Sequence, residues 1–232
     1  MPKRITYLQR RADLPAADFS QHWRTAHAQI AVDLPGAVGY RQNHVLRSAG
    51  GSEFTVDGIV ELWFTSAEVA LAGIGSEVSE RLVADEPRFL SGLTGAPVDA
   101  PGPAALTGFG LWFLGWTPDG SRVSRRELEA IEQALSDVPG AGRVTVNTLE
   151  PNGSLLVRNG LQQMPALPAC AVSVGFAGRG AVQQAEQRLE QDLAGLAAAF
   201  ARVQLLTTEV VSIIEPAGGS GAAGGTPNGG RP

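Results

Sequence analysis

One order of predicted elements occurs twice in the chain, and it limits the folds open to this sequence. The pentapeptide DLPGA at residues 33–37 recurs as DVPGA at residues 137–141, an offset of 104 positions. In both copies the pentapeptide ends a helix-like run and precedes a strand-like run. Matching element order around a shared short motif indicates a tandem duplication.

Each half of the chain shows the same alternation of strand-like and helix-like periodicity. In the first half we predict strands over residues 4–11, 38–47 and 56–64, helices over 15–34 and 66–90, then a short strand and a linker. In the second half we predict strands over 108–116, 142–150, 166–176 and 203–214, and helices over 124–140 and 180–203. The second-half helix 124–140 begins with a capping box, Ser124 with Glu127. Each half therefore has the order βαββαβ, which is the ferredoxin-like pattern of α+β proteins.

The expected architecture follows from how such a unit packs. Two helices cover one face of an antiparallel sheet, and the other face stays apolar until a second copy covers it. We predict one unit over residues 1–100, a linker over 101–107 and a second unit over 108–215, with the two sheets facing each other around a cavity. The tail, residues 216–232, is Gly-rich and has almost no large apolar side chain, so we expect a flexible appendage.

Composition excludes several classes of protein. Apolar residues make up 44% and charged residues 18%, which is enough for a packed core, and the net charge of −5 comes without a basic block that would favour nucleic acid. A lone cysteine, Cys170, cannot form an internal disulfide and suits a reducing compartment. The N-terminus lacks the apolar run of a signal peptide, and no segment has the length of a membrane helix. We expect a cytoplasmic protein.

All three histidines lie in the stretch HWRTAHAQIAVDLPGAVGYRQNHV, residues 22–45. His22 and His27 are five positions apart and would point about 140° apart on an α-helix, so they do not form a metal-chelating pair, and we predict no metal site. His27 lies four residues after Trp23, beside the buried stripe of its helix. It is a candidate general acid or base. Alternatively, it bonds a backbone carbonyl and holds the helix against the sheet.

The predicted strands carry further candidates on alternating faces. Tyr40 and His44 share one face of strand 38–47, and they supply a phenol and an imidazole if that face lines the cavity; alternatively, it packs against the helices. Asn43 lies on the opposite face and could bind a substrate carbonyl if that face lines the cavity instead. Glu61 and Trp63 share a face of strand 56–64. A carboxylate beside a tryptophan would have a raised pKa and could act as an acid, or else it pairs with an arginine.

Aromatic side chains of the second half and the lone cysteine have simpler interpretations. Trp112, Phe113 and Trp116 either line the cavity or fill the core, and the core is the favoured reading. Cys170 reads as a small buried apolar residue rather than a nucleophile.

Four segments together resemble a known family: HWRTAHA, LPGAVGYRQNHV, DGIVELWF and ADEPRFL. They resemble the EthD-like family of the dimeric α+β barrel superfamily over residues 3–90. The second half resembles it only in element order and in the DVPGA echo, as a degenerate copy would. Members usually pair into dimers, so the resemblance implies pairing within one chain, as a monomeric pseudo-dimer or a weak homo-oligomer. It also implies small-molecule chemistry in a pocket within the barrel, without a metal or an organic cofactor.

The resemblance and the residues together lead to one main hypothesis. We expect a cofactor-independent lyase or isomerase, of decarboxylase, dehydratase or lactone isomerase type, acting on a small aromatic, polyketide or lactone substrate. His27, Tyr40 and His44 are the candidate catalytic residues, and Trp23, Asn43, Glu61 and Trp63 are the candidate substrate contacts. The alternative is a non-catalytic small-molecule binding protein of a degradation or biosynthetic cluster. Haem binding is disfavoured because the second half has no histidine to ligate iron.

Overall fold

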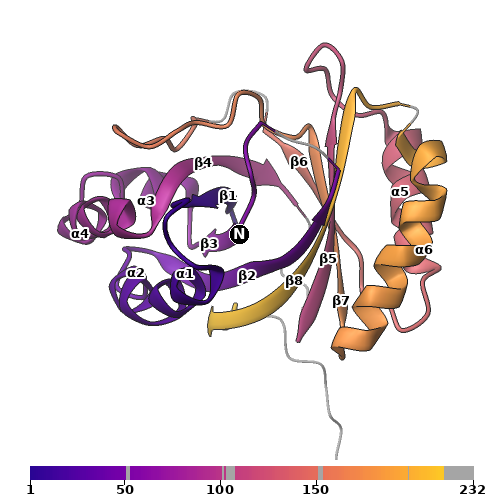
Figure 1. Ribbon diagram of the computed structural model, residues 1–232. Helices are drawn as coiled ribbons and strands as arrows, with labels where there is room; N and C mark the ends of the chain where they lie inside the picture. The colour runs from indigo at the N-terminus through magenta and orange to yellow at the C-terminus, as the bar shows by residue number, and fades with distance from the viewer. Residues whose placement is uncertain (51–52, 101, 103–107, 151–153, 198, 217–232) are drawn as a thin grey trace, which may run out of the picture.

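Eight antiparallel strands close into a barrel in the order β1–β3–β2–β8–β5–β7–β6–β4 (Figure 1). The computed structural model describes residues 1–50, 53–100, 102, 108–150, 154–197 and 199–216. The strands are β1 Lys3–Arg10, β2 Ala37–Ala49, β3 Gly58–Phe64, β4 Leu90–Asp99, β5 Phe109–Trp116, β6 Thr145–Leu149, β7 Cys170–Phe176 and β8 Arg202–Ile214. The helical segments are α1 Ala16–His22, η1 Trp23–His27, α2 Ala28–Ala31, α3 Ala67–Ala72, α4 Glu77–Asp85, η2 Glu86–Arg88, α5 Arg125–Ser136 and α6 Arg179–Ala197. The predicted α+β class is confirmed.

The barrel consists of two sheets of four strands, one from each half of the chain. The first sheet has the order β4–β1–β3–β2 and the second has the equivalent order β8–β5–β7–β6. They join along the long strands β2 and β8, from Tyr40 opposite Ile214 to Ala49 opposite Leu205. The other joint, between β4 and β6, holds only two residue pairs. The barrel therefore closes within one chain.

The repeated pentapeptide makes the same turn in both halves. Gly36 and Gly140 have φ angles of 70° and 79°, the left-handed conformation that favours glycine after a helix. The amide of Ala37 donates to the Leu34 carbonyl, and the amide of Ala141 donates to the Val138 carbonyl. The shared sequence is thus a helix-to-strand turn whose geometry requires glycine at its fourth position.

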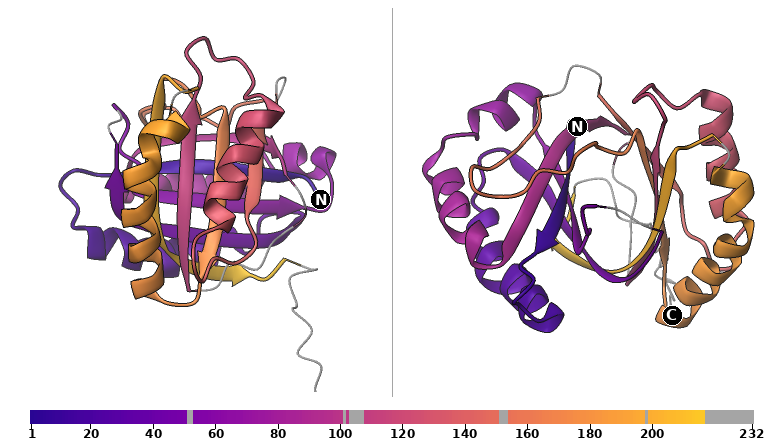
Figure 2. Two further views of the ribbon diagram at one scale, coloured as in Figure 1. Left: turned by 90° about the vertical axis from the view of Figure 1, so that its right-hand side faces the viewer. Right: turned by 45° about the horizontal axis from the view of Figure 1, so that its top comes forward.

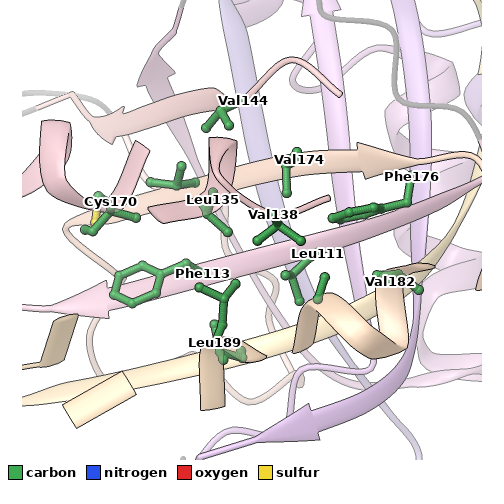
Figure 3. Packing of buried hydrophobic residues seen from close by; sticks show 14 of the residues in the cluster. Leu111, Phe113, Leu135, Val138, Val144, Cys170, Val174, Phe176, Val182 and Leu189 are labelled. Atoms are coloured by element: carbon green, nitrogen blue, oxygen red, sulfur yellow. The ribbon is translucent and has the colours of Figure 1, made fainter. Parts of the chain in front are cut away.

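The helices form two outer layers, one on each side of the barrel (Figures 1 and 2). On the second half, α5 and α6 pack on β5 and β7 through a core of aliphatic and aromatic side chains, which Figure 3 shows from close by. The predicted capping box is confirmed, since Ser124 and Glu127 exchange hydrogen bonds at the start of α5. The predicted helix over residues 66–90 is divided around Gly73 and Gly75 into α3 and α4.

Side chains fill the inside of the barrel. Its apolar part includes Ile5, Tyr7, Ile59, Trp112, Leu114 and Leu206, together with Phe54 and Met164 from loops. Its polar part is an ion cluster, in which Lys3 Nζ lies 2.7 Å from Glu61 Oε1 and Arg41 Nη1 lies 3.2 Å from Glu61 Oε2. An eight-stranded barrel is just wide enough for side chains or one small ligand, and here side chains occupy it. The cavity described below lies outside the barrel, and the expected pocket within the barrel stays a prediction.

The remaining predictions concern membrane helices, the linker and the tail. No helix in the described ranges is long and apolar enough to cross a membrane. The predicted tail and nearly all of the predicted linker lie outside the described residues, which stop at residue 216 and resume at 108.

Candidate functional site

A π-helical turn brings two of the three histidines together. Residues Trp23–His27 form the π-helix η1 between α1 and α2. A π-helix bonds residue i to residue i+5, so residues five apart lie on one side of it. His22 and His27 therefore face the same carboxylate, that of Asp85, and the expected separation of 140° is wrong. Such π-helical turns are frequent at functional sites.

Asp85, the last residue of α4, is within hydrogen-bond distance of both imidazoles. His27 Nδ1 lies 3.0 Å from Asp85 Oδ2, and His22 Nε2 lies 3.0 Å from each carboxylate oxygen. Burial favours a raised pKa for Asp85, but the hydrogen bonds from His27 and His22 outweigh it and hold the pKa below its ordinary value. The ring of Phe89 packs against both imidazoles, at 4.8 Å from His22 and 4.9 Å from His27. Asp85 thus fixes the His27 ring with Nδ1–H as donor and leaves Nε2 without a partner among the described residues.

His27 lines a cavity of about 60 Å³ between the helices and the outer face of the first sheet. Most of its wall is aliphatic, from β1, β3, β4, α2, α3 and α4. Its polar lining consists of Arg4, Thr6, His27, Tyr40, Ser79, Glu86 and Arg158. A water-sized group needs about 10–15 Å³ by this measure, so the space accepts a few such groups.

Tyr40 also lines this cavity, because its face of β2 points toward the helices rather than into the barrel. Its hydroxyl oxygen accepts hydrogen bonds from Trp23 Nε1 at 3.1 Å and from Gln42 Nε2 at 2.7 Å. Burial raises the pKa of Tyr40 to about 12, so the phenol stays protonated at neutral pH. Trp23 is completely buried and is absent from the cavity wall, so it positions Tyr40 instead of touching a ligand.

His44 shares the outward face of β2 but has no free ring nitrogen. Its Nε2 lies 3.0 Å from Gln42 Oε1 and its Nδ1 lies 3.1 Å from Ser20 Oγ. Burial lowers the pKa of His44 to about 3, with a further contribution from the positive charge of Arg24. His44 is therefore neutral and packed on this face, and it does not line the cavity that contains His27. A catalytic role for His44 stays a prediction.

The other three predicted contacts point into the barrel, away from the cavity. Asn43 donates to the Ile59 carbonyl and to Glu61 Oε2. Burial opposes ionisation of Glu61, but the charges of Lys3 and Arg41 outweigh it and lower the pKa of its carboxyl. The expected raised pKa is wrong, and the alternative pairing with an arginine is what the structure shows.

Trp63 completes this interior cluster. Lys3 Nζ lies over its ring, 4.9 Å from the ring centre, and the Arg41 guanidinium lies 5.1 Å from that centre. Asn43 is bonded to Glu61, and Trp63 contacts the two cations that pair with Glu61. None of the three predicted contacts lines the cavity that contains His27.

Sequence reasoning missed a contribution from the second half. Residues 154–164, which we call the strap, run along β4 over the first half, visible as the orange segment beside β4 in Figure 1. Backbone hydrogen bonds join Leu156 to Gly95 and Gln162 to Ser91. Arg158 in the strap donates two hydrogen bonds to Glu86, with Nε 2.6 Å from Oε2 and Nη2 3.2 Å from Oε1. Leu156 and Arg158 thereby close one side of the cavity.

Asp85, Glu86 and Arg4 were also missed as site residues. Asp85 and Glu86 belong to the segment ADEPRFL, which carried part of the family resemblance, so their presence there was the available signal. Arg4 gave no signal beyond its place in a strand.

Two other candidate chemistries have no support in the described part of the chain. Burial raises the pKa of the Cys170 thiol to about 12, so it is no ready nucleophile. No group of three or more His, Cys, Asp or Glu side chains within the described ranges could hold a metal ion.

The barrel, its outer helix layers and this cavity place the chain among α+β barrel proteins. It resembles the crystal structure of an anthrone oxidase-like protein with a TM-score of 0.59, at 11% identity, over 93% of this chain and 94% of that one. It also resembles a proposed monooxygenase from Fusobacterium nucleatum subsp. nucleatum with a TM-score of 0.55, at 13% identity, over 94% of this chain and 95% of that one. Likeness at such identity shows the fold alone.

Sequence comparison identifies the first half more closely. Residues 11–92 match the family model of the EthD domain, which confirms the resemblance expected from the sequence. This match covers α1 through the start of β4 and so includes His27, Tyr40 and Asp85. A search of curated proteins gave no match.

Proposed function

We propose that this chain is an enzyme that moves a proton on a small, largely apolar substrate, as a lyase or an isomerase. The observation that carries the proposal is the His27–Asp85 pair at the wall of a cavity that Tyr40 also lines. An imidazole held by a carboxylate is a common arrangement for a general base, because the carboxylate fixes the tautomer and stabilises the imidazolium that forms.

The proposed roles follow from the hydrogen bonds of each side chain. His27 donates through Nδ1–H to Asp85, so Nε2 carries the lone pair that would accept a proton from the substrate. The Tyr40 oxygen already accepts two hydrogen bonds, which leaves its own O–H proton to donate to a substrate carbonyl. Proton abstraction next to a polarised carbonyl is the chemistry of lactone isomerisation and of polyketide dehydration. In decarboxylation the C–C bond to the carboxylate breaks with release of CO₂, the carbonyl polarised by Tyr40 accepts the electron pair, and a protonated His27 would deliver the proton to the carbon.

The lining of the cavity supports an apolar substrate of the small aromatic, polyketide or lactone class. The wall is mainly aliphatic, and a few polar groups converge on the space, as is usual in small-molecule sites. We further infer that the halves are tandem ferredoxin-like units from an internal duplication, and that the second is a degenerate copy that now supplies the strap. The equivalent strand orders and the paired Gly36 and Gly140 turns support this inference.

A non-catalytic binding protein is the second candidate, and one observation favours it. The contacts of His22 and His27 with Asp85 and Phe89 fasten the first helix to the end of α4. The same contacts would be needed if the histidines only held these helices together around a bound ligand.

One experiment separates the two candidates. A thermal-shift screen of lactones and aromatic polyketides first identifies a compound that binds. NMR in D₂O then follows exchange of its acidic C–H proton, so no product has to be known. His27→Gln keeps a polar side chain but cannot transfer the proton, and we expect exchange to slow by about 10²- to 10⁴-fold with binding within a few-fold.

His22→Gln is the matched control, since it also removes one imidazole from Asp85 but leaves His27 in place. We expect His22→Gln to slow exchange by less than about tenfold. Loss of a general acid or base would slow it by at least about 10²-fold. Binding without any catalysed exchange, or exchange that persists in His27→Gln, would contradict the enzymatic proposal.

A further inference from the structure

Arg4 is a largely buried cation that forms no ion pair with a carboxylate among the described residues. It lies on β1, one position after Lys3, and faces outward toward the helices. Its Nε atom is buried with no hydrogen-bond partner, and no ion pair joins its guanidinium to a described carboxylate. Its one defined contact is with the ring of Phe64, whose centre lies 5.2 Å from the guanidinium carbon.

Glu86 lines the same cavity as Arg4, but its carboxylate is already paired. It is held by two hydrogen bonds from Arg158, and both side chains are almost fully buried. Burial and repulsion from Arg158 together lower the pKa of Arg4 to about 10, and attraction to Glu86 offsets them only in part. Arg4 therefore remains charged at neutral pH, at a place where an unpaired charge is costly.

Arg4 also marks the junction of two cavities. It lines the space of about 60 Å³ that contains His27, and it lines a second space of about 230 Å³ between α3, Phe64 and the strap. Ala70, Ile74 and Leu156 line both spaces as well. On the α3 side the second space has an apolar rim, since Leu71 and Ile74 are 58% and 51% exposed, and on its far side the exposed Glu150 and Ser154 line it. A ligand suited to this site has an apolar body and one small anionic group.

We propose that Arg4 binds the carboxylate of the substrate and so anchors it beside His27. This proposal rests on the proposed function and names the class of substrate as apolar carboxylates. A single guanidinium matches a carboxylate with two parallel hydrogen bonds. A phosphate dianion would need more positive charge than the lining supplies, because Arg158 is engaged by Glu86.

The test compares two aromatic probes that differ only in charge, 2-naphthoate and 2-naphthamide, by NMR titration of the full chain at neutral pH. We expect naphthoate to bind the wild type more tightly than naphthamide. Arg4→Met should weaken naphthoate by about tenfold or more, the usual effect of removing a hydrogen bond to a charged group, and leave naphthamide within a few-fold. Arg81→Met, on the exposed side of α4, is the matched control and should change neither affinity.

The stability of the variant provides a second measurement. Removing an unpaired buried charge should leave the melting temperature of Arg4→Met unchanged or higher, whereas loss of a structural ion pair would lower it. Equal binding of the two probes by the wild type, or naphthoate binding that survives in Arg4→Met, would overturn the proposal. His27→Gln separates this failure from failure of the enzymatic proposal, because it should keep naphthoate binding while it loses proton exchange on the compound that the thermal-shift screen identifies.

Discussion

His44 should make the protein less stable as the pH falls below 6.5. Its imidazole is 2% exposed and packs 4.3 Å from the Trp23 ring, with Ser20 and Gln42 bonded to its two nitrogens. Burial lowers its pKa from 6.5 to about 3, and Arg24 adds to the effect. Between these two pH values the unfolded chain binds a proton at His44 and the native protein does not.

The size of the effect follows from linkage. The free energy of unfolding falls with decreasing pH wherever the unfolded state binds more protons, by about 1.4 kcal/mol per pH unit for one group. The contribution of His44 is thus fully present above pH 6.5 and is lost progressively as the pH falls toward 3. Between pH 7.5 and pH 5.5 we expect a loss of about 1.4 kcal/mol from this residue. Asp85 has a lowered pKa, so it changes the stability only at pH values below the ordinary pKa of an aspartate.

Urea denaturation of the wild type and of His44→Gln at pH 7.5, 6.5 and 5.5 measures this loss. Glutamine can still bond Ser20 and Gln42 but does not titrate, so the variant should lack this part of the pH dependence even if it is less stable throughout. The relevant quantity is the difference between the pH slopes of the two proteins, which removes every contribution that the two proteins share. Parallel curves for the two proteins would show that His44 is protonated in the native state, or that it reaches solvent, and would refute the reasoning.

Two further predictions concern the ion cluster and the repeated turns. Lys3→Met should lower the free energy of unfolding in urea by about 3–5 kcal/mol, because it leaves the buried Glu61 without its closest cation; Lys3→Met with Glu61→Leu should cost less than the two single changes added together. Gly140→Ala should cost about 1–2 kcal/mol from its left-handed backbone alone, since nothing lies within 4 Å of a Cβ there. Gly36→Ala should cost clearly more, because its Cβ would overlap Val69. Equal losses at the two glycines would contradict this account.

The elements could be predicted from the sequence because each has a local signal. Periodicity located seven of the eight strands of the barrel to within a few residues, whereas β4 was expected only as a short strand without defined bounds. The faces of the strands could also be separated by alternation, so that Ile59, Glu61 and Trp63 were grouped correctly against Val60, Leu62 and Phe64. Local signals of this kind depend on neighbours in the chain and survive in a single sequence.

The layer that each face meets could not be predicted, and this explains the errors at the site. All seven residues of β3 are buried, because the sheet has helices on one side and the second sheet on the other. Because both faces are buried, the alternation of side chains does not indicate which face lines the barrel interior. Tyr40 and Glu61 were therefore placed on one side of the first sheet when they lie on opposite sides.

Contacts between residues far apart in the sequence could not be predicted, for a second reason. The partner of His27 is Asp85, and the partner of Glu86 is Arg158, in the other half of the chain. The π-helical turn that aligns His22 with His27 has the same apolar spacing as an ordinary α-helix, since one inserted residue shifts the pattern only locally. Such a turn becomes visible only when its two imidazoles meet one carboxylate.

The two halves have different relations to the cavity, and this difference bears on how the chain works. The barrel interior joins them, through the buried contact of Lys3 with Asn147 on β6 as well as the apolar side chains around it. Outside the barrel, the first half supplies His27, Tyr40 and Asp85, while the second half supplies the strap residues Leu156 and Arg158. A first half alone would keep the proton-transfer residues but lose one wall of their cavity and the partner that neutralises Glu86. The match of the EthD domain to residues 11–92 therefore covers the proposed chemistry, whereas the shape of the site depends on residues beyond it.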